Sequence, residues 1–127
     1  MPWSDAEKAA FIEMQFDAQD RWYRLQYPQA TFDVVVVDGE PAGRLYVNRG
    51  EGEVRIVDIA LLPEHRGGGV GTSLLRDLIG EADAAAKSVT IHVERLNPAL
   101  RLYERLGFAL AEDKGVYLFL ERPARST

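Results

Sequence analysis

Four glycines within five residues, in the stretch PEHRGGGVGTSLL, constrain this chain more than any other feature. They lie between an apolar run, IVDIALL, and a pattern typical of a helix, SLLRDLIGEA. Glycine loses more conformational freedom on folding than any other residue, so such a cluster indicates a backbone conformation, or a close approach to the backbone, that side chains would prevent. The stretch therefore predicts a strand, a glycine-rich loop and a helix in direct succession.

A loop of this kind favours an anion, because a helix begins with unpaired backbone N–H groups at the positive end of its dipole. Two phosphate motifs are excluded. No lysine follows these glycines, as the Walker pattern requires, and the dinucleotide pattern GxGxxG would need a glycine at Thr72 or Leu74. The pattern that fits is RxxGxG, formed by Arg66, Gly69 and Gly71. A flexible turn without a ligand is the alternative interpretation.

The composition limits the class of partner. The chain has 127 residues, 46% of them hydrophobic and 28% charged, which is typical of one globular domain. Its net charge of −5 argues against a nucleic-acid surface, which needs a basic face. The absence of cysteine excludes disulfides and fits a reducing cytosol. No apolar run approaches the roughly 20 residues of a membrane span and no signal pattern opens the chain, so we expect a cytoplasmic protein without membrane contact.

The patterning predicts one α+β domain over residues 1–127, without linkers or repeats. Ser4 and Glu7 form a capping box that opens a helical N-terminal segment, residues 1–30, in which Pro28 ends the helix. A hairpin of FDVVVV and GRLYVN follows, with its turn at Asp38-Gly39, and then a long strand over residues 54–62.

Beyond the glycine loop, the pattern alternates again between helix and strand. Asn97 is expected as the N-cap of a second helix, with Pro98 in its first turn and Gly107 at its end. The other expectations are a helix with Leu74, Leu75, Leu78, Ile79 and Ala82 on one face, a strand at residues 88–94, a hairpin of residues 108–110 and 116–120 around EDKG, and a frayed tail at residues 122–127.

The region from about Phe32 to Leu120 resembles the GNAT superfamily of acyl-CoA-dependent N-acetyltransferases. IVDIALLPEH, RGGGVG and TSLLRDLI resemble that family's pyrophosphate-binding motif, and NPALRLYERLGF resembles its second signature. The two motifs occur in the family's order, with a strand between them. The resemblance implies a mixed, mostly antiparallel central sheet with helices on both faces.

The resemblance also implies acetyl-CoA as co-substrate, and no metal. Backbone N–H groups of the glycine loop would bind the pyrophosphate, while Arg66 adds charge or fixes the loop. The strand around residues 59–61 would splay from SVTIHVE and pair with the pantetheine arm, which Asn97 also contacts. The cofactor-binding residues implied in this way are Ile59, Ala60, Leu61, Arg66, Gly67, Gly68, Gly69, Val70, Gly71, Thr72, Asn97 and Tyr103.

The implied reaction is direct attack of a primary amine on the thioester, through a tetrahedral intermediate. Tyr103 stands where the family places a general acid near the sulfur, although a buried helix aromatic is the alternative. The backbone N–H of Leu61 is the candidate for the oxyanion. Asp58 is the candidate base, because the family's upstream glutamate falls here near Arg55, which cannot accept a proton. Deprotonation through ordered water, or capture of a neutral amine, remains open.

The acceptor is expected to be an amine of a small molecule, peptide or protein, bordered by Trp22, Tyr23, Tyr27, Asp17 and Asp20. A non-catalytic acyl-CoA-binding or sensor module is the alternative function. His65 and His92 are spaced for no metal site: His65 is expected to be exposed in the loop, and His92 to face either the core or the cleft.

Members of the family normally start with a strand and a helix before the segment seen here, whereas the residues before Phe32 have a helical pattern. We therefore expect the first strand to be absent, through a late start site or a truncated product. Its absence would leave FDVVVV as an open apolar edge, which soluble proteins avoid. The N-terminal segment or a second copy in a homodimer is expected to cover that edge.

Overall fold

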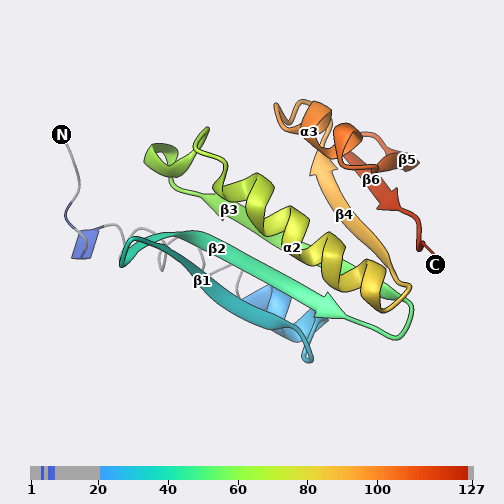
Figure 1. Ribbon diagram of the computed structural model, residues 1–127, viewed down its shortest axis with the longest axis horizontal. Helices are drawn as coiled ribbons and strands as arrows, with labels where there is room; N and C mark the ends of the chain where they lie inside the picture. The colour runs from blue at the N-terminus through green and yellow to red at the C-terminus, as the bar shows by residue number, and fades with distance from the viewer. Residues whose placement is uncertain (1–3, 5, 8–20, 126–127) are drawn as a thin grey trace.

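A six-stranded sheet in the order β1-β2-β3-β4-β6-β5 organises the computed structural model, which describes residues 4, 6–7 and 21–125 (Figure 1). Only β3 and β4 run parallel, so the sheet is mixed and mostly antiparallel, as predicted. The strands are β1 (Thr31–Val37), β2 (Glu40–Arg49), β3 (Glu53–Leu61), β4 (Ser88–Glu94), β5 (Ala109–Lys114) and β6 (Tyr117–Arg122).

Helices cover both faces of the sheet, which confirms the expected layering. On one face, α2 (Val70–Ala84) lies across β3 and β4, and the short α3 (Leu100–Arg105) lies beyond the end of β4 (Figure 1). Leu75, Leu78 and Ala82 of α2 are buried in the core, and they belong to the stripe that the sequence predicts. On the other face, helical residues 21–26 bring Tyr23 edge-on to Tyr46 of β2, at 5.8 Å between ring centroids.

Interactions between residues close together in the chain determine the turn of the first hairpin and the start of the N-terminal helix. Asp38 and Gly39 both adopt positive φ, 51° and 81°, as the two-residue turn of a hairpin requires. At the N-terminus, Ser4 Oγ accepts from the Glu7 N–H at 3.1 Å and Glu7 Oε1 from the Ser4 N–H at 3.3 Å, so the capping box is confirmed. The rest of the expected N-terminal helix, up to residue 20, lies mostly outside the described residues.

The middle of β3 carries an irregularity that matters for the cavity described below. Tyr46 pairs with Asp58 and Val47 with Ile56, which leaves Val57 as an extra residue, a β-bulge. Side chains on a regular strand alternate between faces, so Arg55 and Asp58, three residues apart, would face opposite ways. The bulge places them on the same side of the sheet.

Three predicted boundaries are wrong. α3 begins at Leu100 with Ala99 as N-cap, because Asn97 instead forms a turn in which its Oδ1 accepts from the Ala99 N–H at 2.8 Å. β5 extends through Lys114, so the last hairpin turns at Gly115, whose φ is +86°, rather than around EDKG. Arg122 belongs to no frayed tail, since it ends β6 and is buried.

Arg122 joins three elements. Its guanidinium donates to both carboxylate oxygens of Asp83 at the end of α2, at 2.7 and 3.2 Å, and to the carbonyl oxygen of Leu106 after α3, at 3.0 Å. This bidentate contact lowers the pKa of the Asp83 carboxyl below its ordinary value. Because Arg122 is almost inaccessible to water, removal of its partner leaves a buried cation without compensation.

β1 is an edge strand, and its outer edge has no partner among the described residues. Val34 and Val36 are 53% and 58% exposed, which agrees with the expected apolar edge. No strand precedes β1 in residues 4, 6–7 and 21–30. Cover by the N-terminal segment or by a second copy stays a prediction, and for a second copy light scattering should give the mass of a dimer. A strictly monomeric mass, together with an uncovered edge, would contradict it.

The variant Asp83→Asn should lower the melting temperature at pH 7, and the loss should shrink at acid pH. A carboxyl whose pKa is depressed on folding stabilises the protein above its unfolded pKa of about 3.9, and this stabilisation disappears as the pH falls through the folded value. Glu81→Gln on the same helix is the control, because its partner Arg49 is exposed. Equal losses for both variants at pH 7 would refute the role of Arg122.

Candidate functional site

The glycine loop has the geometry of an anion site. After the 3₁₀ turn η1 (Pro63–His65), Gly67 and Gly69 adopt φ of +78° and +87°, and α2 begins at Val70 with no side chain as cap. Within the described part of the chain, the N–H groups of residues 67–72 donate no hydrogen bond. They lie at the positive end of the α2 dipole, beyond the end of β3 (Figure 1).

The glycines differ in what the chain requires of them. Gly67 and Gly69 need glycine for their backbone conformation. Gly68 has no such φ, and a Cβ built on it meets no atom within 4 Å. Packing among the described residues therefore does not explain a glycine at this position.

Arg66 fixes the loop, as one of its two expected roles. Its Nε donates to the carbonyl oxygen of Leu61 at 3.0 Å, which ties the loop to the end of β3, while the side chain stays exposed. His65, expected to be exposed, is half-buried, and its Nε2 lacks a hydrogen-bond partner in the described part of the chain.

The β3 and β4 strands separate where the cavity opens. Their parallel pairing runs only from Glu53–Ser88 to Ile56–Ile91 and then stops, which confirms the predicted splay. The backbone of residues 57–61 therefore lacks a strand partner on the β4 side, among the described residues. This free edge leads from the cavity to the glycine loop.

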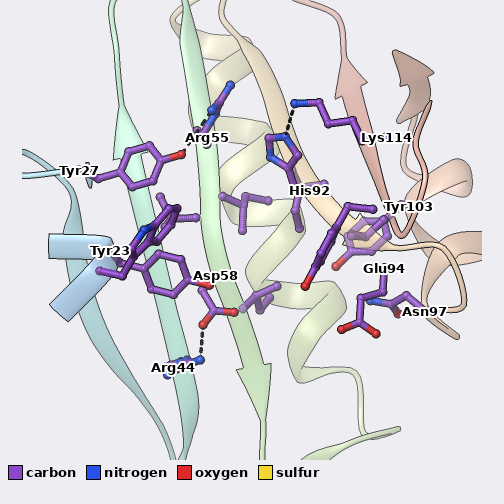
Figure 2. Close-up of a pocket in the computed structure, with 17 residues that line it drawn as sticks. Tyr23, Tyr27, Arg44, Arg55, Asp58, His92, Glu94, Asn97, Tyr103 and Lys114 are labelled. Atoms are coloured by element: carbon purple, nitrogen blue, oxygen red, sulfur yellow. Dashed lines mark hydrogen bonds and ion pairs between the residues drawn. The ribbon is translucent and has the colours of Figure 1, made fainter. Parts of the chain in front are cut away.

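A cavity of about 600 Å³ fills the splay (Figure 2). Residues 21–27, β2, β3, β4, α3 and the β5–β6 hairpin all line it. Among the predicted site residues, Asp58, Ile59, Asn97 and Tyr103 meet here, whereas Ala60, Leu61 and residues 66–72 lie outside its lining. The structure thus separates the glycine loop from the cavity, with the end of β3 between them.

Tyr103 is buried, as the helix-aromatic alternative expects, and it also lines the cavity. Its ring packs edge-on against Phe108 at 5.6 Å, with 4% of the residue exposed. Its hydroxyl points toward the centre of the cavity (Figure 2). Burial, and then the negative charge of Asp58, raise the pKa of the Tyr103 phenol above its ordinary value. The phenol is therefore protonated at neutral pH and is able to donate a proton.

Asp58 lies across the cavity in an ion pair with Arg44 of β2, at 2.5 Å. Both side chains are largely buried, with 18% and 5% exposed. Burial raises the pKa of the Asp58 carboxyl above its ordinary value, and the Arg44 guanidinium offsets part of that rise. Asp58 is thus a carboxylate in a fixed position with more basicity than an exposed aspartate.

The opposite end of the cavity is basic, which the sequence did not predict (Figure 2). Arg55 donates to the hydroxyl of Tyr27 at 3.4 Å, and Lys114 Nζ lies 3.3 Å from Nε2 of His92. Burial and the charges of Lys114 and Arg55 lower the pKa of His92. His92 faces the cavity rather than the core, which settles the two alternatives left open above.

The sequence gives little indication of the charged residues that line the cavity. Arg44 and Arg55 occupy strand positions whose neighbours are apolar, a pattern that equally fits a face exposed to solvent. Lys114 gives no signal, because it comes from the mispredicted turn. Trp22, Tyr23 and Tyr27 line the cavity, as expected of an acceptor border, while Asp17 and Asp20 lie outside the described residues.

Two features are absent from the residues that the structure describes. No group of three or more His, Asp or Glu side chains is arranged to hold a metal ion. No helix is both long and apolar enough to cross a membrane.

Comparison with known proteins identifies the fold and the motifs. The model of the acetyltransferase (GNAT) family matches residues 2–108. A Bacillus subtilis (strain 168) protein that carries the name of a ribosomal-protein-bS18-alanine N-acetyltransferase is 33% identical over 94 residues, which cover 70% of this chain and 62% of that protein. Streptothricin acetyltransferase of Streptomyces lavendulae is 36% identical over 92 residues, which cover 68% of this chain and 49% of that protein. The chain thus spans between half and two thirds of the length of these relatives.

A solved structure supports the same fold. The GNAT family acetyltransferase of Elizabethkingia anophelis, with acetyl-CoA bound, superposes with a TM-score of 0.69 at 16% identity. The similarity covers 84% of this chain and 82% of that one.

The two loop glycines should respond differently to the same substitution. Gly69→Ala forces a side chain into a left-handed conformation and should cost about 1 kcal/mol of unfolding free energy, measured by urea titration. Gly68→Ala, the matched control, should stay within about 0.5 kcal/mol of the wild type, because its Cβ meets nothing. Equal destabilisation by both would contradict the assignment of the loop conformation.

Proposed function

The chain belongs to the acetyltransferase (GNAT) family, and from that premise we propose that it transfers an acetyl group from acetyl-CoA to the nitrogen of a primary amine. The observation that carries the proposal is the row of backbone N–H groups at residues 67–72 that donate no hydrogen bond within the described part of the chain. This row lies next to the point where β3 and β4 separate and a cavity opens. The acetyl-CoA-bound relative supports the choice of co-substrate.

The loop fits a diphosphate by its chemistry. Backbone N–H groups at a helix N-terminus bind an anion without a cluster of basic side chains, so a chain with a net charge of −5 is able to hold a polyanion locally. Arg66 adds one positive charge beside the loop while its Nε holds the Leu61 carbonyl. The open space over Gly68 leaves room for the ligand.

The free edge of β3 gives the next part of the site. Residues 59–61 have backbone groups without a strand partner on the β4 side, and an amide-containing arm would pair with them as an added strand does. Such an arm would run from the loop toward the cavity, where Asn97 and Tyr103 lie. The acetyl group, supplied as a thioester, would then reach the middle of the splay.

In the proposed step, the amine nitrogen forms a bond to the acetyl carbonyl carbon and the carbon–sulfur bond breaks. The backbone N–H of Leu61 is assigned to the developing oxyanion, and because Leu61 lies on the free edge of β3 outside the cavity lining, this role requires the acetyl group to lie at the β3 end of the cavity. Tyr103 donates its hydroxyl proton to the departing sulfur, which its raised pKa permits because the phenol remains protonated. Asp58 accepts the proton that the amine loses, and the ion pair with Arg44 keeps its carboxylate in place.

The two relatives indicate the class of acceptor only broadly. The names of the two relatives specify an alanine of a ribosomal protein in one case and streptothricin in the other, so similar chains take both macromolecules and small molecules. We assign this chain a primary amine of a small molecule, peptide or protein.

The variant Tyr103→Phe should reduce kcat about 100-fold, the scale of a general acid, with acetyl-CoA affinity and melting temperature nearly unchanged because the ring packing against Phe108 is kept. Thiol release is the readout. In the wild type, no loss of rate from this group is expected up to about pH 10, since its pKa lies above the ordinary phenol value. An unchanged kcat in the variant would remove Tyr103 from the mechanism.

Turnover of acetyl-CoA on a panel of amines, followed by mass spectrometry of the acceptors, tests the proposed function itself. Acceptor-dependent thiol release with a gain of one acetyl group supports it. Saturable binding of acetyl-CoA without turnover on any amine would indicate the non-catalytic acyl-CoA-binding module instead.

A further inference from the structure

Both carboxylates that line the cavity lie at one end, where Arg44 pairs with Asp58, and the other cationic side chains lie at the opposite end. Asp58 and Glu94 lie at the end near Tyr103, whereas Arg55, His92 and Lys114 lie at the other end (Figure 2). The side chains of Arg55 and Lys114 come from different elements, β3 and β5, and meet the cavity on either side of His92. Because Arg44 neutralises Asp58, Glu94 leaves one negative charge in excess near the proposed reaction, whereas the lining of the other end carries only cationic or basic side chains.

The carboxylates that pair with these cations do not line the cavity. Glu53 contacts Arg55 at 3.2 Å and accepts from Thr90 at 2.6 Å, and Glu112 contacts Lys114 at 3.4 Å, but neither glutamate is part of the lining. The pKa of His92 shows which charges are stronger at this end. Lys114 and Arg55 lower that pKa more than the two glutamates, Glu112 and Glu53, raise it. The cations thus dominate the field at this end.

The distance between the two ends suits a short acceptor. Arg55 and Asp58 lie three residues apart on β3, which corresponds to roughly 10 Å of strand, shortened by the bulge. An extended peptide covers this distance in two to three residues. Tyr23 and Tyr27 flank the space between the two ends.

We propose that Arg55 and Lys114 form a subsite for a carboxylate of the acceptor, so that the cavity selects amines that carry an acid group about two peptide units from the nitrogen. Two sources have this chemistry: a peptide N-terminus followed by an acidic side chain, and a small amino acid with its own carboxylate. The inference rests on the proposed function, because the amine is placed at the Asp58 end, and it specifies the acceptor which that function leaves open.

The test uses the full chain and two pairs of probes that differ only in charge. The peptide pair is Ala-Glu-Ala-amide and Ala-Gln-Ala-amide, and the small-molecule pair is 6-aminohexanoate and its amide. For each probe, KM is measured by thiol release and the dissociation constant by calorimetry with coenzyme A present. The acid of at least one pair should bind about tenfold more tightly than its neutral partner, the scale of one charge-assisted hydrogen bond. The pair with the larger ratio identifies the source.

Variants that remove one charge test which side chains cause the preference for the acid probe. Lys114→Gln and Arg55→Gln should each bring the acid-to-neutral ratio toward one, while Lys87→Gln, which removes the same charge outside the cavity, should leave it unchanged. Lys114 is half-exposed, so its variant tests the subsite even if Arg55→Gln, which loses contacts to Glu53 and Tyr27, folds poorly.

The outcomes separate the subsite from the reaction. A preference for the acid in the binding measurement, without turnover of any probe, supports the subsite and refutes the proposed transfer. Turnover with equal KM and equal dissociation constants within both pairs refutes the subsite alone. A wild-type preference that both Lys114→Gln and Arg55→Gln retain also overturns the assignment.

Discussion

The pairing between β3 and β4 is the constraint on which the rest of the site depends. It holds over four residue pairs and then ends, because the strands diverge after Ile56 and Ile91. Before that point the two strands form the centre of the core under α2. After it, the free edge of β3 and the cavity appear together, so the divergence of the two strands produces both of the features on which the proposed function rests.

Two local features of β2 and β3 shape that divergence. A Cβ on Gly43 would overlap the carbonyl oxygen of Ala60 and lie 2.9 Å from Cα of Leu61, so the close approach of the two backbones requires glycine there. The bulge at Val57 brings Arg55 to the same face as Asp58. The first feature holds the end of β3 against β2 and the second gives the cavity two charged ends.

The sequence predicted the features that follow from local rules. The Asp38-Gly39 turn, the buried stripe of α2 and the glycine-rich start of that helix depend on residues close together in the chain, and the resemblance to GNAT proteins supplied the splay. The position of Asn97 was misjudged because its side chain forms a turn two residues before the helix. The basic end of the cavity was missed because it depends on a bulge and on a hairpin turn, which shift strand faces without a sign in the periodicity.

In the proposed function, backbone amides of residues 67–72 hold the diphosphate of coenzyme A. Titration of coenzyme A into the isotope-labelled chain, followed by amide chemical shifts, measures this contact residue by residue. We expect saturable shifts at residues 67–72, with smaller ones at residues 59–61 along the free edge of β3. Saturable binding that shifts amides elsewhere and leaves residues 67–72 unmoved would contradict it.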